Sequence, residues 1–307
     1  MGESKGTGRD PAERSIAAVI DRVYAAVCAR ERGEREEGLR WGLPDLDELT
    51  GGLKAGELAV LAGRPSMGKT ALAHDLLRHA TLVGGRGAVL FSRLPSEAAV
   101  ERLLCAQARV SARRTWGGFL DLEERRRFLG ACDALHGARL FCVSEGFTPL
   151  ASVAAASREL AAAHPIDLVV VEGVERLWGE AHEPARPTAV GRVLSALARE
   201  ISVAVLALAP VTRRAAAQRG PSAQDVWGGA GLLGHADKLI LLHRADSYRP
   251  DREELRGRAQ VLVALNRTGC TGVCELRFVR SEVRFESIGL GPAGPATAIE
   301  PRPGGGG

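Results

Sequence analysis

The sequence predicts an α/β domain in which a mostly parallel central sheet is flanked by helices and is followed by a C-terminal β-hairpin. From residue 39 onward, short runs of β-branched and apolar residues alternate with longer runs of helical periodicity. A glycine loop with the spacing G-x-x-x-x-G-K-[ST] joins the first such strand to the first long helix of this region. The 307 residues, of which 45% are hydrophobic and 25% charged, suffice for one large core.

Each predicted element follows from its local pattern. Seven apolar runs of strand length are predicted as strands: 58–62, 88–92, 139–143, 167–171, 203–208, 238–243 and 260–266. Five runs with helical spacing of apolar residues are predicted as helices: 71–81, 96–110, 121–136, 149–163 and 189–201. The last two apolar runs, 272–279 and 282–287, are predicted to close as a hairpin.

Other segments flank this domain, which we place at residues 39–288. Residues 1–10 and the Gly/Pro-rich residues 289–307 are predicted to be disordered. Residues 11–38 are predicted to form a linker helix and a charged linker, because an apolar stripe that includes Ile16 and Val23 recurs at helical spacing. A short helix cannot bury such a stripe alone. It must dock on a neighbouring subunit or on the chain's own core, and both alternatives stay open.

Composition excludes several classes of protein. No apolar run of 18 residues and no secretory signal is visible, so we expect no membrane partner and a cytoplasmic location. The six Cys lack paired metal-ligand spacing, which is typical of free thiols in a reducing compartment. The formal net charge of +4 permits nucleic-acid binding without arguing strongly for it.

The glycine loop is predicted to bind the phosphates of ATP together with Mg²⁺. A glycine-bounded turn lets successive backbone N–H groups point at phosphate oxygens, and the following helix adds its positive N-terminal end. Lys69 would reach the outer phosphates, and the Thr70 hydroxyl would hold Mg²⁺. A chance match is the alternative in a chain with 37 Gly, but only four of the 41 Lys and Arg residues are Lys, and one stands here. The predicted cofactor-binding residues are Gly63, Arg64, Pro65, Ser66, Met67, Gly68, Lys69 and Thr70.

Around this loop the sequence resembles the RecA-like ATPase domain of DnaB-type replicative helicases. The stretches that carry the resemblance are 42–53, 56–58, 64–70, 91–92, 95–97, 146–150, 199–208 and 266–269. Among RecA-like proteins, the loop sequence R-P-S-M-G-K-T is typical of the DnaB type. The likeness covers residues 11–288 and identifies the expected fold as a RecA-like P-loop NTPase.

The resemblance implies a hexameric ring with head-to-tail interfaces that threads single-stranded DNA and couples ATP hydrolysis to translocation. It implies that Lys69, Thr70, Glu172 and Arg267 are the catalytic residues, with Arg267 as an arginine finger for the neighbouring subunit's nucleotide. Thr70 and Glu172, the residue directly after the fourth predicted strand, are the implied metal ligands. The helix at 11–32 would dock on the adjacent subunit and hold the ring together.

Several positions depart from the family pattern. After the second strand the family carries a Glu that activates the attacking water, whereas residues 93–95 here read Arg-Leu-Pro, one residue short and without the carboxylate. Glu172 stands where the family has Asp, so the metal-binding oxygens move by one methylene. Residues 209–210 read Ala-Pro in place of a Ser-Gln pair that senses the γ-phosphate, and Leu265 replaces a second interface cation. We therefore expect ATP binding to be kept and hydrolysis to be impaired.

The loop at 211–231 is predicted to line the DNA channel of the ring. Arg213, Arg214 and Arg219 would supply the positive charge that tracks phosphates. Trp227 would either stack on a base or pack at an interface. The run Gly-Gly-Ala-Gly at 228–231 predicts a mobile loop.

The leading interpretation is a DnaB-like, ATP-dependent DNA helicase-family protein with a role in DNA replication. It would bind ATP, Mg²⁺ and single-stranded DNA. Two alternatives stay open: a non-catalytic ATP-binding protein that assembles with or regulates a ring, and a recombination ATPase of the RadA or KaiC sort.

Overall fold

The chain divides into two units, Met1–Glu37 and Gly38–Gly307, in the computed structural model, which describes residues 15–32, 38–144, 149–179, 184–212, 220–249 and 251–289. The first unit contains helix α1 (Ile16–Glu31), which lies within the predicted helix at 11–32. The side chains of Ile16, Ile20, Val23 and Tyr24 on this helix are exposed. Of the two segments that we predict to be disordered, 1–10 and 289–307, all residues except Gly289 lie outside the described residues.

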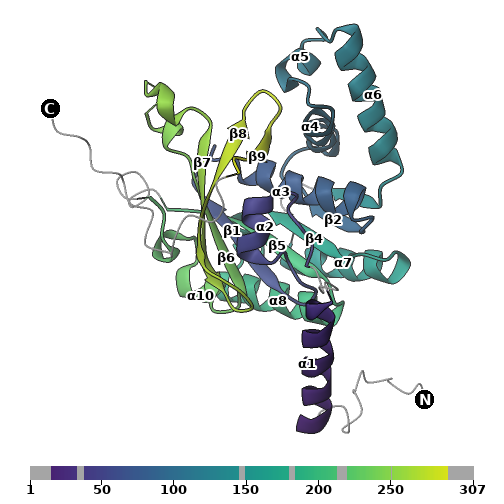
Figure 1. The fold of residues 1–307 in the computed structure, drawn as a ribbon, viewed down its shortest axis with the longest axis vertical. Helices are drawn as coiled ribbons and strands as arrows, with labels where there is room; N and C mark the ends of the chain where they lie inside the picture. Colours follow the sequence, from purple (N-terminus) through teal and green to yellow (C-terminus); the bar gives the residue numbers. More distant parts are fainter. Residues whose placement is uncertain are drawn as a thin grey trace, which may run out of the picture. The chain divides into compact units, whose positions relative to one another are not determined.

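The second unit is built on a nine-stranded sheet with the strand order β3-β2-β4-β5-β1-β6-β7-β8-β9 (Figure 1). The pairs from β3 to β6 in this order are parallel, and those from β6 to β9 are antiparallel. The predicted RecA-like α/β class, with a mostly parallel sheet and a C-terminal hairpin, is therefore confirmed. The strands are β1 (Leu58–Gly63), β2 (Ala88–Phe91), β3 (Leu140–Val143), β4 (Leu168–Glu172), β5 (Ala204–Pro210), β6 (Lys238–His243), β7 (Arg258–Asn266), β8 (Gly272–Val279) and β9 (Arg284–Ser287).

All five helices predicted after residue 39 are present, with shifted ends. They are α3 (Lys69–Arg78), α4 (Ser96–Ala108), α6 (Leu122–His136), α7 (Leu150–Ala163) and α8 (Pro187–Glu200). The first of them begins inside the glycine loop and continues as a π-helix over His79–Val83. Asp121 explains where α6 begins, because its side chain accepts from the Glu124 N–H at 2.8 Å and completes a capping box.

Within the described ranges, three short α-helices go beyond the prediction: α2 (Pro44–Thr50), α5 (Ala112–Trp116) and α10 (Gly229–Leu233). Elements this short do not show a helical period in the sequence. Helix α10 corrects the predicted mobile loop at 228–231. A Cβ on Gly228 would lie 2.4 Å from Pro187 Cβ, and one on Gly231 would lie 2.8 Å from Thr188 Oγ1. The glycines therefore serve the close approach of α10 to α8.

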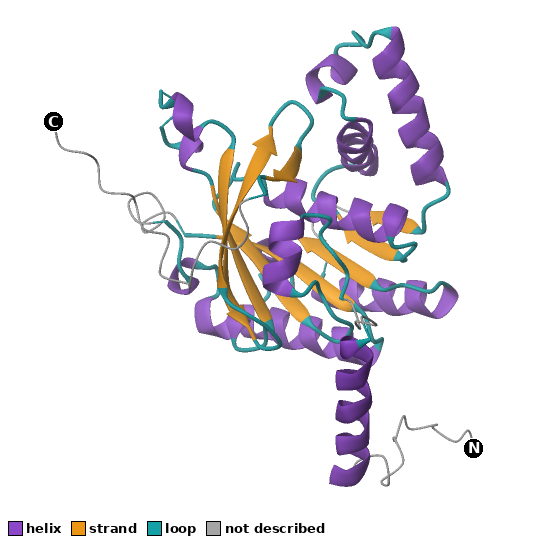
Figure 2. Cartoon of the chain, viewed as in Figure 1, coloured by secondary structure: helices purple, strands orange, loops and turns teal. Residues whose placement is uncertain are grey.

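Helices cover both faces of the sheet (Figure 2), and each face has its own apolar cluster. Successive side chains of β1 alternate between the two faces. Ala59 and Leu61 pack with α2, α3 and α4, whereas Leu58, Val60 and Ala62 pack with α7, α8 and α10. Every residue of β1 is buried, as expected for a parallel strand with helices on both sides. None of the helices in the described ranges is long and apolar enough to cross a membrane.

A buried ionic cluster ties the beginning of β1 to β6 and β7. Lys238 donates hydrogen bonds to Glu57 Oε2 and, at 3.1 Å, to Thr268 Oγ1. The Thr268 hydroxyl donates in turn to Glu57 Oε1 at 2.7 Å. Burial lowers the pKa of Lys238 although the Glu57 carboxylate opposes this change. The ammonium therefore depends on Glu57 to stay charged inside the fold.

We expect Lys238→Met to lower the free energy of unfolding by about 3–5 kcal/mol, because it leaves the Glu57 carboxylate buried without its cation. Denaturant unfolding measures this loss. The double variant Lys238→Met with Glu57→Leu removes both charges and should lose less stability than Lys238→Met alone. Equal losses in the two variants would contradict the role of the pair.

Asp75 links α3 to the hairpin from a buried position. Its Oδ2 accepts the Phe285 N–H at 2.7 Å, and its Oδ1 lies 3.3 Å from the Arg78 guanidinium. The Asp75 side chain is only 1% exposed. Burial raises the pKa of Asp75 to about 6, and the two contacts only partly oppose this shift. The carboxylate is therefore costly to keep ionised in the folded state.

Stability should follow the titration of Asp75. Since its folded pKa lies above the usual value of 3.8, the folded protein binds a proton here that the unfolded chain does not, and the stability contributed by Asp75 rises as pH falls through about 6. Relative to Asp75→Asn, wild type should gain up to about 3 kcal/mol of unfolding free energy between about pH 7.5 and pH 4. Chemical unfolding of both proteins across this range measures the difference, and a difference that does not change with pH would refute the assignment.

Candidate nucleotide site

The glycine loop lies at the carboxyl end of β1, between β5 and β6, and leads directly into α3. Close contacts require glycine at two places. A Cβ on Gly63 would lie 2.7 Å from the Leu242 carbonyl oxygen, and one on Gly68 would lie 2.9 Å from Phe285 Cζ. Gly68 also has a φ of +100°, which residues with a side chain rarely adopt. The loop backbone therefore follows a path that depends on these glycines.

Lys69 begins α3, and its ammonium folds back over the loop. Nζ donates to the carbonyl oxygens of Gly63, at 2.7 Å, and Arg64, at 3.1 Å. Burial lowers the pKa of Lys69 to about 8, a shift that Glu175 and Glu172 oppose and Arg93 increases. A cation that has lost much of its water and is bonded to neutral carbonyl groups is well suited to attract an anion.

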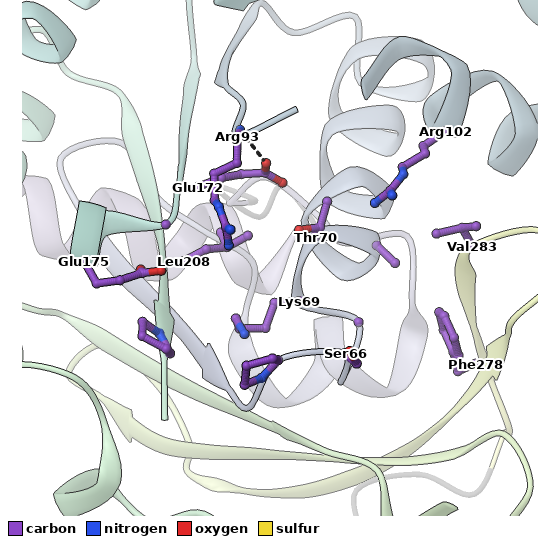
Figure 3. Close-up of a pocket in the computed structure, with 15 residues that line it drawn as sticks. Ser66, Lys69, Thr70, Arg93, Arg102, Glu172, Glu175, Leu208, Phe278 and Val283 are labelled. Atoms are coloured by element: carbon purple, nitrogen blue, oxygen red, sulfur yellow. Dashed lines mark hydrogen bonds between the residues drawn. The ribbon is translucent and has the colours of Figure 1, made fainter. Parts of the chain in front are cut away.

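A pocket of about 360 Å³ lies beside the loop (Figure 3). The predicted site residues Pro65, Ser66, Gly68, Lys69, Thr70 and Glu172 all line it. The remaining loop residues support it from outside the lining. The Arg64 guanidinium lies 5.0 Å from the centre of the Tyr248 ring, and Met67 is buried with its sulfur accepting the Arg244 N–H at 3.3 Å.

Glu172 is held at the end of β4 by the turn that follows β2. Its Oε2 accepts the Arg93 backbone N–H at 3.1 Å and lies 3.4 Å from the Ser92 hydroxyl, which donates to it. Its Oε1 lies 3.9 Å from His74 Nε2, and both side chains are 2% exposed. Burial lowers the pKa of His74, so this imidazole is neutral near pH 7 and does not balance the Glu172 charge.

The pocket fits a divalent cation bound to a nucleotide. Thr70 and Glu172, the predicted Mg²⁺ ligands, both line it. The buried atoms Glu172 Oε1 and Glu175 Oε2 accept no hydrogen bond from the described part of the chain. Carboxylate oxygens with open lone pairs are preferred Mg²⁺ ligands. The glycine loop leaves room for phosphates beside them.

Some pocket residues are not among those that the sequence predicts. Arg93 and Arg102 point into the pocket from the β2–α4 turn and from α4 (Figure 3). Phe278 and Val283 reach it from the β8–β9 hairpin, about 200 residues along the chain, and no local pattern marks them. The apolar periodicity predicts the helix that carries Arg102, but it does not predict that the Arg102 side chain reaches the glycine loop.

The wall formed by β5 carries no hydrogen-bonding side chain in this pocket. Leu208 and Pro210 line it, and the family's Ser-Gln pair would belong to this same strand. Glu97, the nearest carboxylate after β2 in the chain, is an exposed residue in the first turn of α4 and does not line the pocket. The described pocket therefore keeps the residues that we predict to bind phosphate and lacks the side chains that the family places around the γ-phosphate.

Arg267 does not line this pocket. It follows β7, whose last residue, Asn266, pairs with Lys238 at the beginning of β6, so Arg267 lies at the sheet edge opposite the glycine loop of its own chain. Its Nε donates to the Ala236 carbonyl oxygen at 3.0 Å, and the residue is exposed. A role for Arg267 in catalysis therefore requires a second subunit.

The predicted DNA-binding residues are placed only in part. Arg213, Arg214 and Arg219 lie outside the described residues. Trp227 is half-buried and packs against the apolar cluster on the α7–α8 face of the sheet. Trp227 therefore contacts the core of its own chain, and both predicted roles, a contact with DNA and packing at an interface, stay predictions.

The family model of the DnaB-like helicase C-terminal domain matches residues 38–287. The replicative DNA helicase DnaB of Treponema pallidum is 32% identical over 254 residues, which are 81% of this chain and 56% of the helicase. The DnaB of Geobacillus stearothermophilus is 25% identical over 283 residues, 90% of this chain and 62% of that protein. The chain thus spans less than two thirds of these relatives.

Solved structures show the same fold. A DnaB-like replicative helicase, whose interactions with primase were described with its structure, superimposes with a TM-score of 0.79 at 22% identity over 92% of this chain and 68% of that one. A separately solved ATPase domain gives the same TM-score of 0.79 at 22% identity, over 90% of this chain and 99% of that domain. The RadB recombinase is more distant, with a TM-score of 0.55 at 18% identity, over 81% of this chain and 99% of the recombinase.

We expect Gly68→Ala to lower the affinity for a nucleoside triphosphate at least about tenfold. The new methyl group can avoid the Phe285 ring only if the loop moves its N–H groups away from the ligand, and each lost bond to a charged group is costly. Titration calorimetry measures the effect. Gly118→Ala is the matched control, because Gly118 also has a positive φ, +72°, but no atom lies within 4 Å of the place that a Cβ would take there. Equal affinities for the two variants would contradict the argument.

Proposed function

The chain belongs to the family of DnaB-like helicase C-terminal domains, and we propose that it binds ATP with Mg²⁺ as the ATPase module of a DNA helicase-family protein in replication. The glycine-loop pocket carries this proposal. The half-buried Lys69 ammonium, the N-terminus of α3 and the unpartnered oxygens of Glu172 and Glu175 suit a phosphate chain with a bound cation. When bound, Mg²⁺ would neutralise charge on the phosphates.

The residues of this chain would bind and orient the nucleotide more effectively than they would cleave it. Lys69 would hold the outer phosphates, while Thr70 and Glu172 would hold the cation. No carboxylate replaces the family's general base in the turn after β2, and such a loss lowers rates about 10²- to 10⁴-fold. Leu208 and Pro210 offer no hydrogen bond at the β5 wall. We therefore infer slow hydrolysis.

These same features favour a second candidate function: a non-catalytic ATP-binding protein that assembles with or regulates a ring. In that case the nucleotide would act as a structural ligand, and binding without turnover would suffice. The recombination ATPase has no comparable support, because the likeness to the RadB recombinase extends to the fold alone.

We further propose that the chain forms a hexameric ring with head-to-tail interfaces around single-stranded DNA, as expected for its family, in the cytoplasm. The position of Arg267 supports a head-to-tail arrangement, because an exposed cation at the edge opposite its own glycine loop can reach only a neighbour's nucleotide. Contacts of Arg213, Arg214, Arg219 and Trp227 with DNA are part of this proposal.

Nucleotide binding and phosphate release, each measured with and without single-stranded DNA, test the proposed function. Lys69→Ala should lower ATP affinity at least about tenfold, because it removes a charge-assisted contact with the phosphates. Lys54→Ala is the matched control, because Lys54 does not line the pocket. The DNA helicase interpretation requires turnover that DNA stimulates above the Lys69→Ala level.

The outcomes separate the two candidates. Binding of ATP without turnover above the Lys69→Ala level supports the non-catalytic assembly protein. Failure of the wild-type protein to bind ATP in the presence of Mg²⁺ would overturn both.

A further inference from the structure

Two guanidinium groups in the pocket have no partner among the residues that the structure describes. Arg93 and Arg102 line the pocket, and neither side chain forms a hydrogen bond or ion pair there. Two buried arginines of this region, by contrast, are paired. The Arg244 guanidinium lies 3.0 Å from Asp246, and that of Arg284 lies 2.6 Å from Glu282. Unpaired cations beside a phosphate-binding loop are candidates for ligand contacts.

Arg93 is aimed into the pocket by its surroundings. Its backbone N–H is fixed by Glu172 Oε2 at 3.1 Å. Its aliphatic stem then passes over Gly173, where a Cβ would lie 2.4 Å from Arg93 Cδ and 3.2 Å from Cγ. Because Gly173 has no side chain, the aliphatic part of Arg93 can pass over it. Figure 3 shows the guanidinium beyond Glu172, on the side of Lys69.

Arg102 approaches from the opposite side of the pocket. It belongs to α4, and its guanidinium points toward Thr70 (Figure 3). The two guanidinium groups thus lie on the far side of Lys69 and Thr70 from the loop residue Ser66. A phosphate chain whose inner part rests on the loop would extend toward them.

The charges of the pocket agree with this placement. Its ionisable lining residues are three cations, Lys69, Arg93 and Arg102, and two carboxylates, Glu172 and Glu175. Arg93 repels Lys69, as its contribution to the lowered pKa of Lys69 shows. An anion between the cations relieves this repulsion, and a guanidinium can bind phosphate oxygens with two parallel hydrogen bonds.

We propose that Arg93 and Arg102 bind the terminal phosphate of a nucleoside triphosphate within the same subunit, so that the pocket prefers triphosphates to diphosphates. This inference rests on the proposed nucleotide function and deepens it. The turn after β2 supplies a phosphate ligand where the family supplies a general base. The contact stabilises the bound triphosphate itself, and binding of that kind does not accelerate cleavage.

Calorimetric titration with a non-hydrolysable ATP analogue and with ADP, both with Mg²⁺, tests the inference. Wild type should bind the analogue at least about 100-fold more tightly than ADP, because each of the two arginines contributes a charge-assisted bond to the terminal phosphate that is worth about one order of magnitude or more. Arg93→Ala and Arg102→Ala should each weaken analogue binding about 10- to 100-fold and leave ADP binding within about twofold. The double variant should bind both ligands almost equally.

Two further variants separate ligand contacts from effects on folding. Gly173→Ala keeps both arginines but displaces the Arg93 stem, so it should also lower the preference for the triphosphate. Arg256→Ala removes an arginine whose side chain is 82% exposed and outside the pocket, and it should change neither affinity. Melting temperatures of the arginine variants should match wild type, because Arg93 is an exposed residue and Arg102 is half-buried.

The results distinguish this inference from the function on which it rests. Wild-type binding of both ligands with an unchanged preference in the double variant would overturn the role of the arginines and leave the nucleotide site intact. An equal loss of analogue and ADP affinity would also overturn it, because the arginines would then not recognise the terminal phosphate. Absence of any nucleotide binding by wild type would overturn both proposals.

Discussion

The site depends on one half-buried ammonium group at the beginning of α3. Lys69 loses much of its hydration and donates hydrogen bonds to two carbonyl groups of its own loop. These carbonyls are in reach because Gly63 and Gly68 let the backbone pass close to β6 and to the hairpin. A desolvated cation of this kind makes the pocket a site for anions, and the carboxylates at the end of β4 keep it charged.

The end of β4 is the second organising point of the pocket. One oxygen of Glu172 fixes the turn after β2 through the Arg93 N–H and the Ser92 hydroxyl, while the other is buried near His74 and accepts no hydrogen bond from the described residues. The turn therefore keeps its place although its side chains differ from the family pattern. Phosphate binding uses backbone geometry and positive charge, which this chain retains. Cleavage needs particular side chains, and Leu208 and Pro210 show that these have changed.

Most of the fold could be predicted because each long element carries its own periodicity. The strands buried on both faces read as continuous apolar runs, and helices such as α8 place Val190, Leu194 and Leu197 on one buried side. The short helices α2, α5 and α10 could not be predicted in this way. In α10 the glycines suggested mobility, but contacts with Pro187 and Thr188 show that they permit close packing, which is a property of two elements together.

The sequence by itself determined the glycine loop, the carboxylate that follows the fourth predicted strand and the family, because these are encoded by residues close together in the chain. Tertiary structure decided which distant groups complete the pocket. It placed Arg93, Arg102 and Phe278 beside the loop and left Arg267 at the opposite edge of the sheet. The physical reason is that the strand order brings β4, β5 and the hairpin next to α3. Whether a side chain points into a pocket shared by several elements depends on contacts between those elements, and no local sequence pattern contains these contacts.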